Sequence, residues 1–212
     1  MKFCVIGVGR FGLQVALTLA ENGMEVLAID SNEATVASIR DKVTQAICMR
    51  VNDEDDLKNI GVEEMDCVIV AMGENFAQSI LITALLKQRL NIKRVITRSI
   101  SQIHKDILQL IGADQVVLPE QEVGVHLADQ LSLPFKAIIR ITPNFSISEF
   151  TAPKWTHNKM IKELDFDAYN IQCIGRKEED DIVHVSQEYM INANDVLIIA
   201  GNNLDVLKLL LS

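Results

Sequence analysis

The first thirty residues constrain this chain more than any other stretch. A short apolar run at residues 2–6 leads into the motif Gly-Val-Gly-Arg-Phe-Gly at residues 7–12, a helical pattern follows, and a second apolar run ends at Asp30. This order predicts a strand, a glycine turn, a helix and a second strand that ends in an acid. Such an arrangement is typical of a domain that binds a nucleotide at the edge of a parallel sheet.

Each part of this motif has a physical role in holding a nucleotide. Gly7 permits a tight turn, Gly9 lets a diphosphate approach the backbone, and Gly12 lets the helix lie close to the sheet. The amides at the start of the helix attract phosphate. Asp30 lies about 20 residues after the glycines, where an acid accepts hydrogen bonds from ribose hydroxyls and repels a 2′-phosphate, which disfavours NADP. The alternative is a turn that only packs the helix on the strand.

Length and composition predict a soluble globular protein with one large domain, or a medium domain and a small companion. The 212 residues are 49% hydrophobic and 23% charged, as in ordinary folded proteins. The longest apolar stretch, residues 80–86, is far shorter than the ~20 residues of a membrane span. The amino terminus runs into the glycine turn without a small-residue cleavage site, so we interpret it as a strand rather than a signal peptide and expect a cytoplasmic protein.

Charge, cysteine and histidine content exclude other classes. The net charge of −9 argues against a DNA or RNA partner, because nucleic-acid binders concentrate Lys and Arg on one face. The histidines are scattered without the spacing of metal ligands, so no zinc site is expected. No CxxC pair occurs and each cysteine lies in an apolar run, which predicts four buried, reduced thiols: Cys4, Cys48, Cys67 and Cys173.

Strands and helices alternate through the rest of the amino-terminal part. Strands are expected at residues 2–6, 25–30, 45–49, 66–71, 93–98 and 115–118. Helices are expected from Ser31 or Asn32 to about 41, from Asn52 or Asp53 to 61, from 75 to about 90, from 101 to 111 and from 120 to 131. Six strands alternating with helices predict an α/β fold with a doubly wound parallel sheet, Rossmann-like in its organisation. Residues 50–53 then follow the third strand, at the sheet edge where such folds bind ligands.

The pattern changes near residue 132. Beyond it, short strands cluster at residues 136–141, 146–150, 170–176, 182–185 and 196–200, with helices near 158–164 and 203–211. Clustered strands predict a small α+β lobe rather than a continuation of the parallel sheet. We therefore expect two domains, at residues 1–132 and 136–212, and a lobe of this size often completes its core by dimerising.

Several segments together resemble a known family. Residues 7–12, 26–30, 66–74 and 111–120 are similar to the RCK (KTN) domain of potassium-transport regulators of the TrkA/KtrA type, and residues 194–201 resemble the small carboxyl-terminal lobe that follows it. The Gly-Arg-Phe-Gly sequence and the Gly-Ala-Asp sequence with its following Pro-Glu are more specific than the glycines alone. The resemblance covers essentially the whole chain.

The resemblance implies that ATP, ADP, NAD or NADH binds the amino-terminal domain. Arg10 would reach phosphate in its own or a neighbouring subunit, Asp30 would hold ribose, and Glu120 would approach the γ-phosphate or a Mg²⁺ ion that accompanies ATP. The residues implied to bind the nucleotide are Gly7, Val8, Gly9, Arg10, Phe11, Gly12, Asp30, Ser31, Arg50, Asn52, Asp53, Ala71, Met72, Gly73, Glu74, Arg98 and Glu120.

The resemblance also implies partners. In this family a cytosolic regulatory subunit assembles as dimers into an octameric ring, beneath a separate potassium-translocating membrane subunit of the KtrB or TrkH type. Nucleotides change the shape of the ring and thereby gate potassium flux. Some relatives bind cyclic di-AMP between paired carboxyl-terminal lobes, but no residue set distinct enough to support that ligand occurs here.

Two departures from the family pattern stand out. The family usually has Gly-Asp-Ala-Thr after the third strand, whereas this chain has Met-Arg-Val-Asn at residues 49–52. Arg50 thus replaces an acid that commonly contacts the adenosine half, which leaves the base preference open. The usual Gly-Asp before the last strand is Asn194-Asp195, and Asn still tolerates a left-handed turn.

The same glycine motif also occurs in NAD-dependent oxidoreductases, which are the alternative class. Neither Tyr169 nor Tyr189 belongs to a Tyr-x-x-x-Lys pair, no nucleophile elbow occurs, and His126 is isolated. A redox-sensing repressor would need a basic recognition helix, and none is evident. The sequence therefore favours a regulatory subunit that is not an enzyme over an oxidoreductase with an unidentified small substrate.

Overall fold

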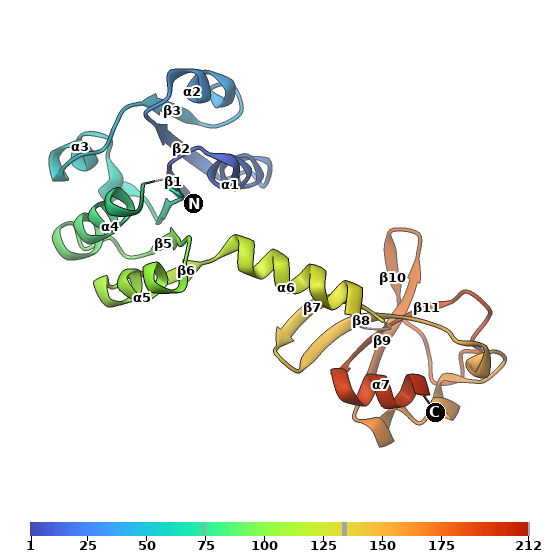
Figure 1. Cartoon of the computed structure of the whole chain (residues 1–212). Coiled ribbons are helices and arrows are strands. Elements are labelled where there is room, and N and C mark those ends of the chain that lie inside the picture. Colours follow the sequence, from blue (N-terminus) through green and yellow to red (C-terminus); the bar gives the residue numbers. More distant parts are fainter. Residues whose placement is uncertain (74, 133–134, 212) are drawn as a thin grey trace. The chain divides into compact units, whose positions relative to one another are not determined.

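The computed structural model describes residues 1–73, 75–132 and 135–211. The chain divides into two compact units, Met1–Glu122 and Val123–Ser212, which run from blue to green and from yellow to red in Figure 1. Each unit has its own sheet and its own core. No helix among these residues combines the length and apolar composition required to cross a bilayer.

The first unit is built on a six-stranded parallel sheet with the order β3-β2-β1-β4-β5-β6. Every neighbouring pair is parallel. The predicted doubly wound sheet is therefore confirmed. Its strands are β1 (Lys2–Ile6), β2 (Glu25–Asp30), β3 (Gln45–Cys48), β4 (Cys67–Val70), β5 (Val95–Arg98) and β6 (Gln115–Val117).

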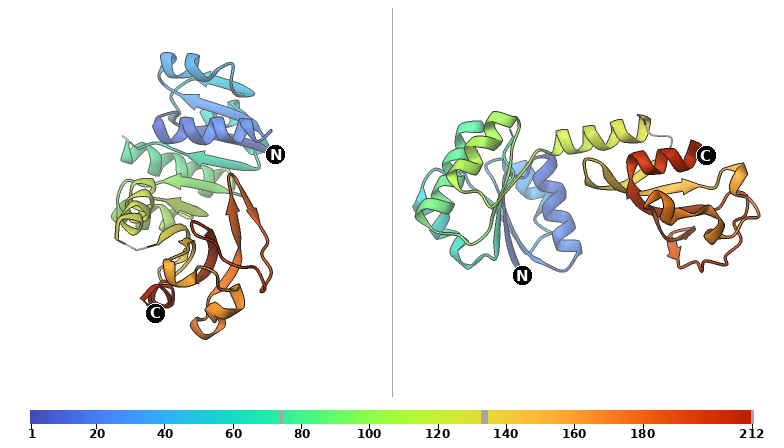
Figure 2. Two further views of the ribbon diagram at one scale, coloured as in Figure 1. Left: turned by 90° about the vertical axis from the view of Figure 1, so that its right-hand side faces the viewer. Right: turned by 90° about the horizontal axis from the view of Figure 1, so that it is seen from below.

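Helices cover both faces of this sheet (Figures 1 and 2). Successive residues of a strand point to opposite faces: Cys4 and Ile6 of β1 join a core with α3 and α4, while Val5 joins a core with α1 and α2. The central strands are apolar on both faces for this reason. These helices are α1 (Arg10–Glu21), α2 (Glu33–Ile39), α3 (Glu54–Asn59), α4 (Phe76–Ala84) and α5 (Gln102–Ile111), with a 3₁₀ turn η1 (Val62–Glu64). Helix α6 (Pro119–Ser132) follows β6 and runs from the first unit into the second.

Side-chain caps fix where these helices begin. Asn32, Asp53 and Ser101 each accept a hydrogen bond from a backbone N–H three residues on, which satisfies an amide that has no partner in the helix. Gly112 ends α5 with φ +103°, as predicted for an αL residue after a helix. The helix expected to reach about residue 90 ends as α4 at Ala84 and continues as a π-helical turn, η2 (Leu85–Arg89).

A buried polar contact joins α4 to α5. His104 of α5 is fully buried, and its Nε2 atom lies 2.9 Å from the Ser79 hydroxyl of α4. Its ring packs on Phe76 with 4.4 Å between centroids. Burial lowers the pKa of His104 below its ordinary value, so the imidazole is held neutral as a structural hydrogen-bonding group.

The second unit is a five-stranded antiparallel sheet with the order β10-β9-β11-β8-β7. Helix α7 (Asn203–Leu211) packs against it through Val206 and Leu209, which share a core with Phe150 and Leu197. The predicted small α+β lobe is confirmed. The remaining elements are β7 (Lys136–Thr142), β8 (Phe145–Thr151), β9 (Gln172–Glu178), β10 (Asp181–Val183) and β11 (Val196–Asn202), with 3₁₀ turns η3 (Lys154–Thr156), η4 (Ile161–Leu164) and η5 (Phe166–Tyr169).

The helix predicted at residues 158–164 is wrong. Only the 3₁₀ turn η4 forms there, because Asn158 (φ +61°) and Asp165 (φ +48°) adopt left-handed conformations that break a helix on both sides. Asn170 (φ +52°) similarly delays the start of β9 to Gln172. Asn194 has φ +73°, which confirms the left-handed turn expected before the last strand.

The prediction of four buried cysteines holds for two of them. Cys4 and Cys67 are buried, whereas Cys48 is exposed and Cys173 is half-buried. Cys48 ends β3, which is the edge strand of the sheet and has a neighbour on one side only. Burial, and then the neighbouring Cys67, raise the pKa of the Cys4 thiol to about 12.

Candidate nucleotide-binding site

The sheet order creates a crevice at the carboxyl ends of β1 and β4. From β1 the chain continues through β2 and β3 to one side, and from β4 through β5 and β6 to the other. The turns after β1 and β4 therefore diverge and leave an opening between them. This topological switch point is where open α/β sheets bind ligands.

The glycine turn after β1 forms the first wall of the crevice. Gly7 has φ +93° and donates its N–H to the Ile29 carbonyl at 2.8 Å. A Cβ atom on Gly12 would lie 1.9 Å from the Gly7 oxygen, so only glycine allows α1 to pack so closely on the turn. A Cβ atom on Gly9 would meet nothing within 4 Å. Gly12 therefore serves packing, while Gly9 borders open space.

The start of α1 has the properties of a phosphate site. Gly9 is its N-cap residue and brings no side chain to the first-turn amides, which have no partners inside a helix. These amides and the helix dipole attract an anion. The residues present therefore fit a phosphate group, with the exposed Arg10 beside them.

Asp30 stands beside the glycine turn and is held by two backbone amides. Its Oδ2 atom accepts from the Val8 N–H at 2.7 Å and its Oδ1 atom accepts from the Asn32 N–H at 2.9 Å. Each carboxylate oxygen has a further lone pair. Asp30 can therefore accept hydrogen bonds from ribose hydroxyls without giving up these contacts.

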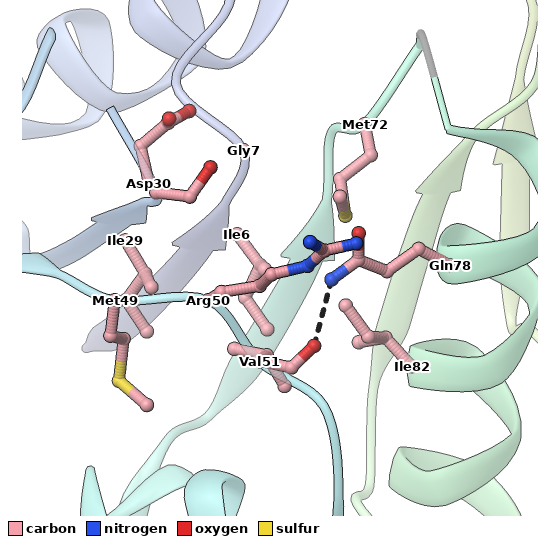
Figure 3. A pocket seen from close by; sticks show the side chains of 11 residues that line it. Ile6, Gly7, Ile29, Asp30, Met49, Arg50, Val51, Met72, Gln78 and Ile82 are labelled. Carbon is pink, nitrogen blue, oxygen red and sulfur yellow. Dashed lines mark hydrogen bonds between the residues drawn. The ribbon is translucent and has the colours of Figure 1, made fainter.

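A small pocket continues from Asp30 toward β3 and α4 (Figure 3). It encloses about 50 Å³, far below the several hundred Å³ of a closed ligand pocket, so it is an inlet of an open crevice. Aliphatic side chains line its floor, and Asp30, Arg50 and Gln78 supply its polar groups. The lining residues are Ile6, Gly7, Ile29, Asp30, Ser31, Met49, Arg50, Val51, Met72, Gln78 and Ile82.

Arg50 and Gln78 close the side of this pocket that faces away from Asp30. The guanidinium of Arg50 points toward the Gln78 amide in Figure 3. Gln78 is fixed by donating from Nε2 to the Val51 carbonyl at 2.8 Å. An apolar floor with a planar cation and an amide at its rim suits a nucleobase, because the flat ring can pack on the aliphatic side chains and meet the polar groups at its edge.

A second group of residues stands at the ends of β4 and β5. A Cβ atom on Gly73 would lie 2.5 Å from Nη1 of Arg98, so the guanidinium rests directly on the Gly73 backbone. Its Cζ atom lies 5.8 Å from the centroid of the Phe11 ring, within the range of a cation–π contact. Arg98 also forms an ion pair with Glu120 of α6. The name Arg98 cluster is used below for Phe11, Gly73, Arg98 and Glu120.

Glu120 remains ionised in this cluster. The hydrogen bond from its own backbone N–H, and then the charges of Arg98 and Arg10, hold the pKa of the Glu120 carboxyl below its usual range. Because Phe11 is the second residue of α1, the cluster lies on the same side of the crevice as the start of that helix.

A larger cavity of about 350 Å³ lies elsewhere in the first unit. Lys2 and Glu25, at the amino ends of β1 and β2, line it together with residues near η1. Because parallel α/β sheets bind ligands at the opposite, carboxyl edge, this cavity is not the candidate site.

Comparisons with known sequences identify the family of this chain. A family model described as the TrkA-N domain matches residues 3–119. Ktr system potassium uptake protein A of Bacillus subtilis (strain 168) is 34% identical over 208 residues, which are 97% of this chain and 93% of that protein. The chain belongs to the KtrA-type RCK family.

Solved structures share the fold of this KtrA-type chain at low sequence identity. The GsuK channel bound to NAD superposes with a TM-score of 0.54 at 19% identity, over 98% of this chain and 37% of that one. GsuK bound to ADP gives 0.54 at 23% identity, over 62% of this chain and 34% of that one. The chain thus spans about a third of the length of the GsuK polypeptide.

The candidate residues of this KtrA-type chain are not all brought together. Asp30, Ser31, Arg50 and Met72 line the pocket with Gly7. The backbone amide of Val8 bonds Asp30, and the N–H of Ala71 bonds the Ile6 carbonyl at 2.8 Å, so both have structural contacts beside the crevice. Asp53 caps α3, and the N–H of Asn52 donates to Asp56; neither lines the pocket. Glu74 lies outside the described residues.

Sequence reasoning missed pocket residues just after β3 and on α4. Met49 and Gln78 line the pocket but carry no motif, whereas Val51 lies within residues 50–53, which were expected at this edge. Gln78 could have been found from the Asn75 cap, whose side chain accepts from the Gln78 N–H, because that cap fixes the first turn of α4 at the crevice. The described residues contain no cluster of three or more His, Cys, Asp or Glu side chains that could hold a metal ion.

Proposed function

We propose that this chain is the nucleotide-binding regulatory subunit of a potassium uptake system and that it is not an enzyme. It binds an adenine nucleotide, ATP/ADP or NAD(H), in the crevice between β1 and β4, and Mg²⁺ accompanies ATP. The nucleotide changes the conformation of a homo-oligomeric ring of dimers. The ring then controls potassium flux through a separate membrane subunit of the KtrB or TrkH type, at the inner face of the membrane.

One observation carries the proposal. This chain is 34% identical along nearly its whole length to a potassium uptake protein. In addition, its Asp30 carboxylate is held against a glycine turn that borders open space. Ribose and phosphate are the groups that this pair of elements recognises. The NAD and ADP found in GsuK support a ligand of the same class here.

Regulation requires that the nucleotide bind two arrangements of the ring with different affinities. A nucleotide that bound both arrangements of the ring equally would shift neither population, however tightly it bound. The proposal therefore includes unequal affinity for the two states, with the gated flux as the output of that difference.

Two measurements test the proposal. The first is the thermal midpoint of the full chain with ATP, ADP, NAD, NADH and NADPH, because ligands that bind the native state raise it. Stabilisation by ATP or ADP is expected, and it is expected to be lost in Gly9→Ala. A response confined to NAD and NADH, together with turnover of NADH, would instead favour an oxidoreductase.

The second measurement is potassium uptake in a strain that lacks its own uptake systems. The strain expresses a KtrB-type membrane subunit alone, with the wild-type chain, or with Gly9→Ala. Nucleotide-dependent regulation predicts that the wild-type chain changes the uptake rate and that Gly9→Ala does not. Equal rates with and without the wild-type chain would contradict the regulatory role.

A further inference from the structure

The buried His104 ring has a partner at each of its two nitrogen atoms. Its Nδ1 atom accepts a hydrogen bond from the Ile100 N–H at 3.4 Å, and its Nε2 atom lies 2.9 Å from the Ser79 hydroxyl. Because Nδ1 accepts, the proton of the neutral ring is on Nε2, which donates to that hydroxyl. The Ser79 hydroxyl in turn donates to the Phe76 carbonyl at 3.3 Å. This set of hydrogen bonds therefore suits the neutral imidazole.

A second proton on the ring would have no acceptor in this arrangement. It would bind Nδ1, which faces the Ile100 N–H, so that two donors would oppose each other. The charged ring would also be fully buried, which is unfavourable for an ion without a partner. Protonation of His104 therefore requires that the contact between α4 and α5 open.

The elements around the ring supply no compensating negative charge. Helix α4 and residues 99–101 contain no ionisable side chain. Arg98, at the end of β5, is itself a cation, and the neighbours of His104 on α5 are the half-buried Lys105 and the exposed Asp106. Among the described residues, burial alone lowers the pKa of His104 below its ordinary value, as for a ring without an anionic partner.

The first turn of α4 connects this contact to the nucleotide pocket. The ring contacts Phe76 and Ser79, which lie within one turn of Gln78. Gln78 lines the pocket (Figure 3) and donates from Nε2 to the Val51 carbonyl, while its backbone N–H donates to the Asn75 cap at 3.1 Å. Because a hydrogen-bonded helical turn moves as a unit, a change at the buried ring reaches a side chain that borders the pocket.

We propose that His104 is a proton-sensitive positioning residue of the nucleotide site. The neutral ring holds the first turn of α4, and with it Gln78, against the pocket, whereas protonation releases this turn and lowers the affinity for the nucleotide. This inference rests on the proposed function and adds pH as a second input to it. Linkage makes the effect reciprocal: a nucleotide that contacts Gln78 holds the turn in place and makes His104 harder to protonate.

The first test is isothermal titration calorimetry of ADP at pH 7.5 and pH 5.5, in EDTA, on wild type and His104→Gln. Glutamine offers a donor and an acceptor but does not titrate. From pH 7.5 to 5.5, we expect the ADP affinity of wild type to fall about threefold more than that of His104→Gln. The phosphates of ADP titrate alike in both experiments, so their contribution cancels in the comparison.

The matched control is His184→Gln, which removes an exposed histidine of the second unit. Its ADP affinity is expected to depend on pH as in wild type. Circular dichroism at both pH values checks that each variant is folded.

A second measurement needs no substitution, so it remains decisive if His104→Gln fails to fold. Hydrogen exchange at the C2 position of histidine, followed by mass spectrometry of peptides, gives the pKa of each histidine in the wild-type chain. Saturating ADP is expected to lower the pKa of His104 further and to leave that of His184 unchanged.

Two outcomes overturn the inference. One is an equal loss of ADP affinity at low pH in wild type and His104→Gln, and the other is a pKa of His104 that is the same with and without ADP. Either would mean that His104 stabilises the fold without controlling the pocket, and the proposed function would stand, since ADP still binds at pH 7.5. Wild-type protein that binds neither ADP nor NAD at pH 7.5 would instead refute the proposed function itself.

Discussion

Two glycines of the same turn are expected to respond oppositely to alanine. In Gly12→Ala the new methyl group would lie 1.9 Å from the backbone oxygen of Gly7 and 2.9 Å from the Ala71 Cβ atom. Backbone cannot rotate away as a side chain can, so α1 must shift from the sheet. In Gly9→Ala the methyl group meets nothing within 4 Å, and Gly9 already has an ordinary φ of −69°.

The expected magnitudes follow from these distances. Overpacking against a fixed backbone costs about 3 kcal/mol, so Gly12→Ala is expected to lower the melting midpoint of the first unit by roughly 10 °C. Gly9→Ala is expected to stay within about 1 kcal/mol of wild type. It nevertheless fills the space where a phosphate approaches the backbone, so nucleotide affinity falls at least about tenfold, which corresponds to 1.4 kcal/mol.

The assay is urea denaturation of each variant, followed by far-UV circular dichroism, together with calorimetric titration of ADP. Since the chain has two compact units, fluorescence of Trp155, which lies in the second unit, reports the unit that carries neither substitution. A Gly12→Ala protein as stable as wild type would refute the packing argument. A Gly9→Ala protein with unchanged ADP affinity would refute the assignment of phosphate to this turn.

Three further predictions follow from individual side chains. Asp30→Ala leaves two backbone N–H groups without their acceptor, so it is expected to cost about 1–2 kcal/mol in unfolding free energy and to weaken adenosine nucleotides in the same titration; unchanged affinity would remove Asp30 from the site. Burial lowers the pKa of His104, so the unfolded chain takes up a proton at a higher pH than the folded chain does. The free energy of unfolding is therefore expected to fall as pH drops below about 6.5. Urea melts between pH 7.5 and 5.5 are expected to show that this free energy depends less on pH in His104→Gln than in wild type. A maleimide reagent is expected to label the exposed Cys48 in the native chain before the buried Cys4 and Cys67, as mass spectrometry of peptides would report, and early labelling of Cys4 would contradict the burial that raises its pKa.

Local signals in the sequence were sufficient for the first unit. The glycines, the apolar strands and caps such as Ser101 and Gly112 act through a few neighbouring residues, and each predicts an element without knowledge of the rest of the fold. Their agreement also predicted the parallel sheet and the crevice at its edge. Asp30 could be placed at that edge because it ends a strand.

The remaining features depend on contacts between distant parts of the chain. The exposure of Cys48 follows from the position of β3 at the sheet edge, which no local pattern encodes. The contact of Arg98 with Glu120 spans 22 residues, and the close approach to Gly73 depends on how β4 and β5 align. The left-handed Asn158 and Asp165 each look like ordinary polar residues in a helical pattern. Their conformations are set by the surrounding second unit.

The two amide contacts of Asp30 have a consequence for the thermodynamics of recognition. An acid that is free to rotate loses conformational entropy when a ligand orders it, and this loss offsets part of the new hydrogen bonds. The Val8 and Asn32 amides already hold the carboxylate of Asp30 in a single orientation. The ordering is therefore complete when the chain folds, and the ribose contact is expected to contribute mainly a favourable enthalpy of association.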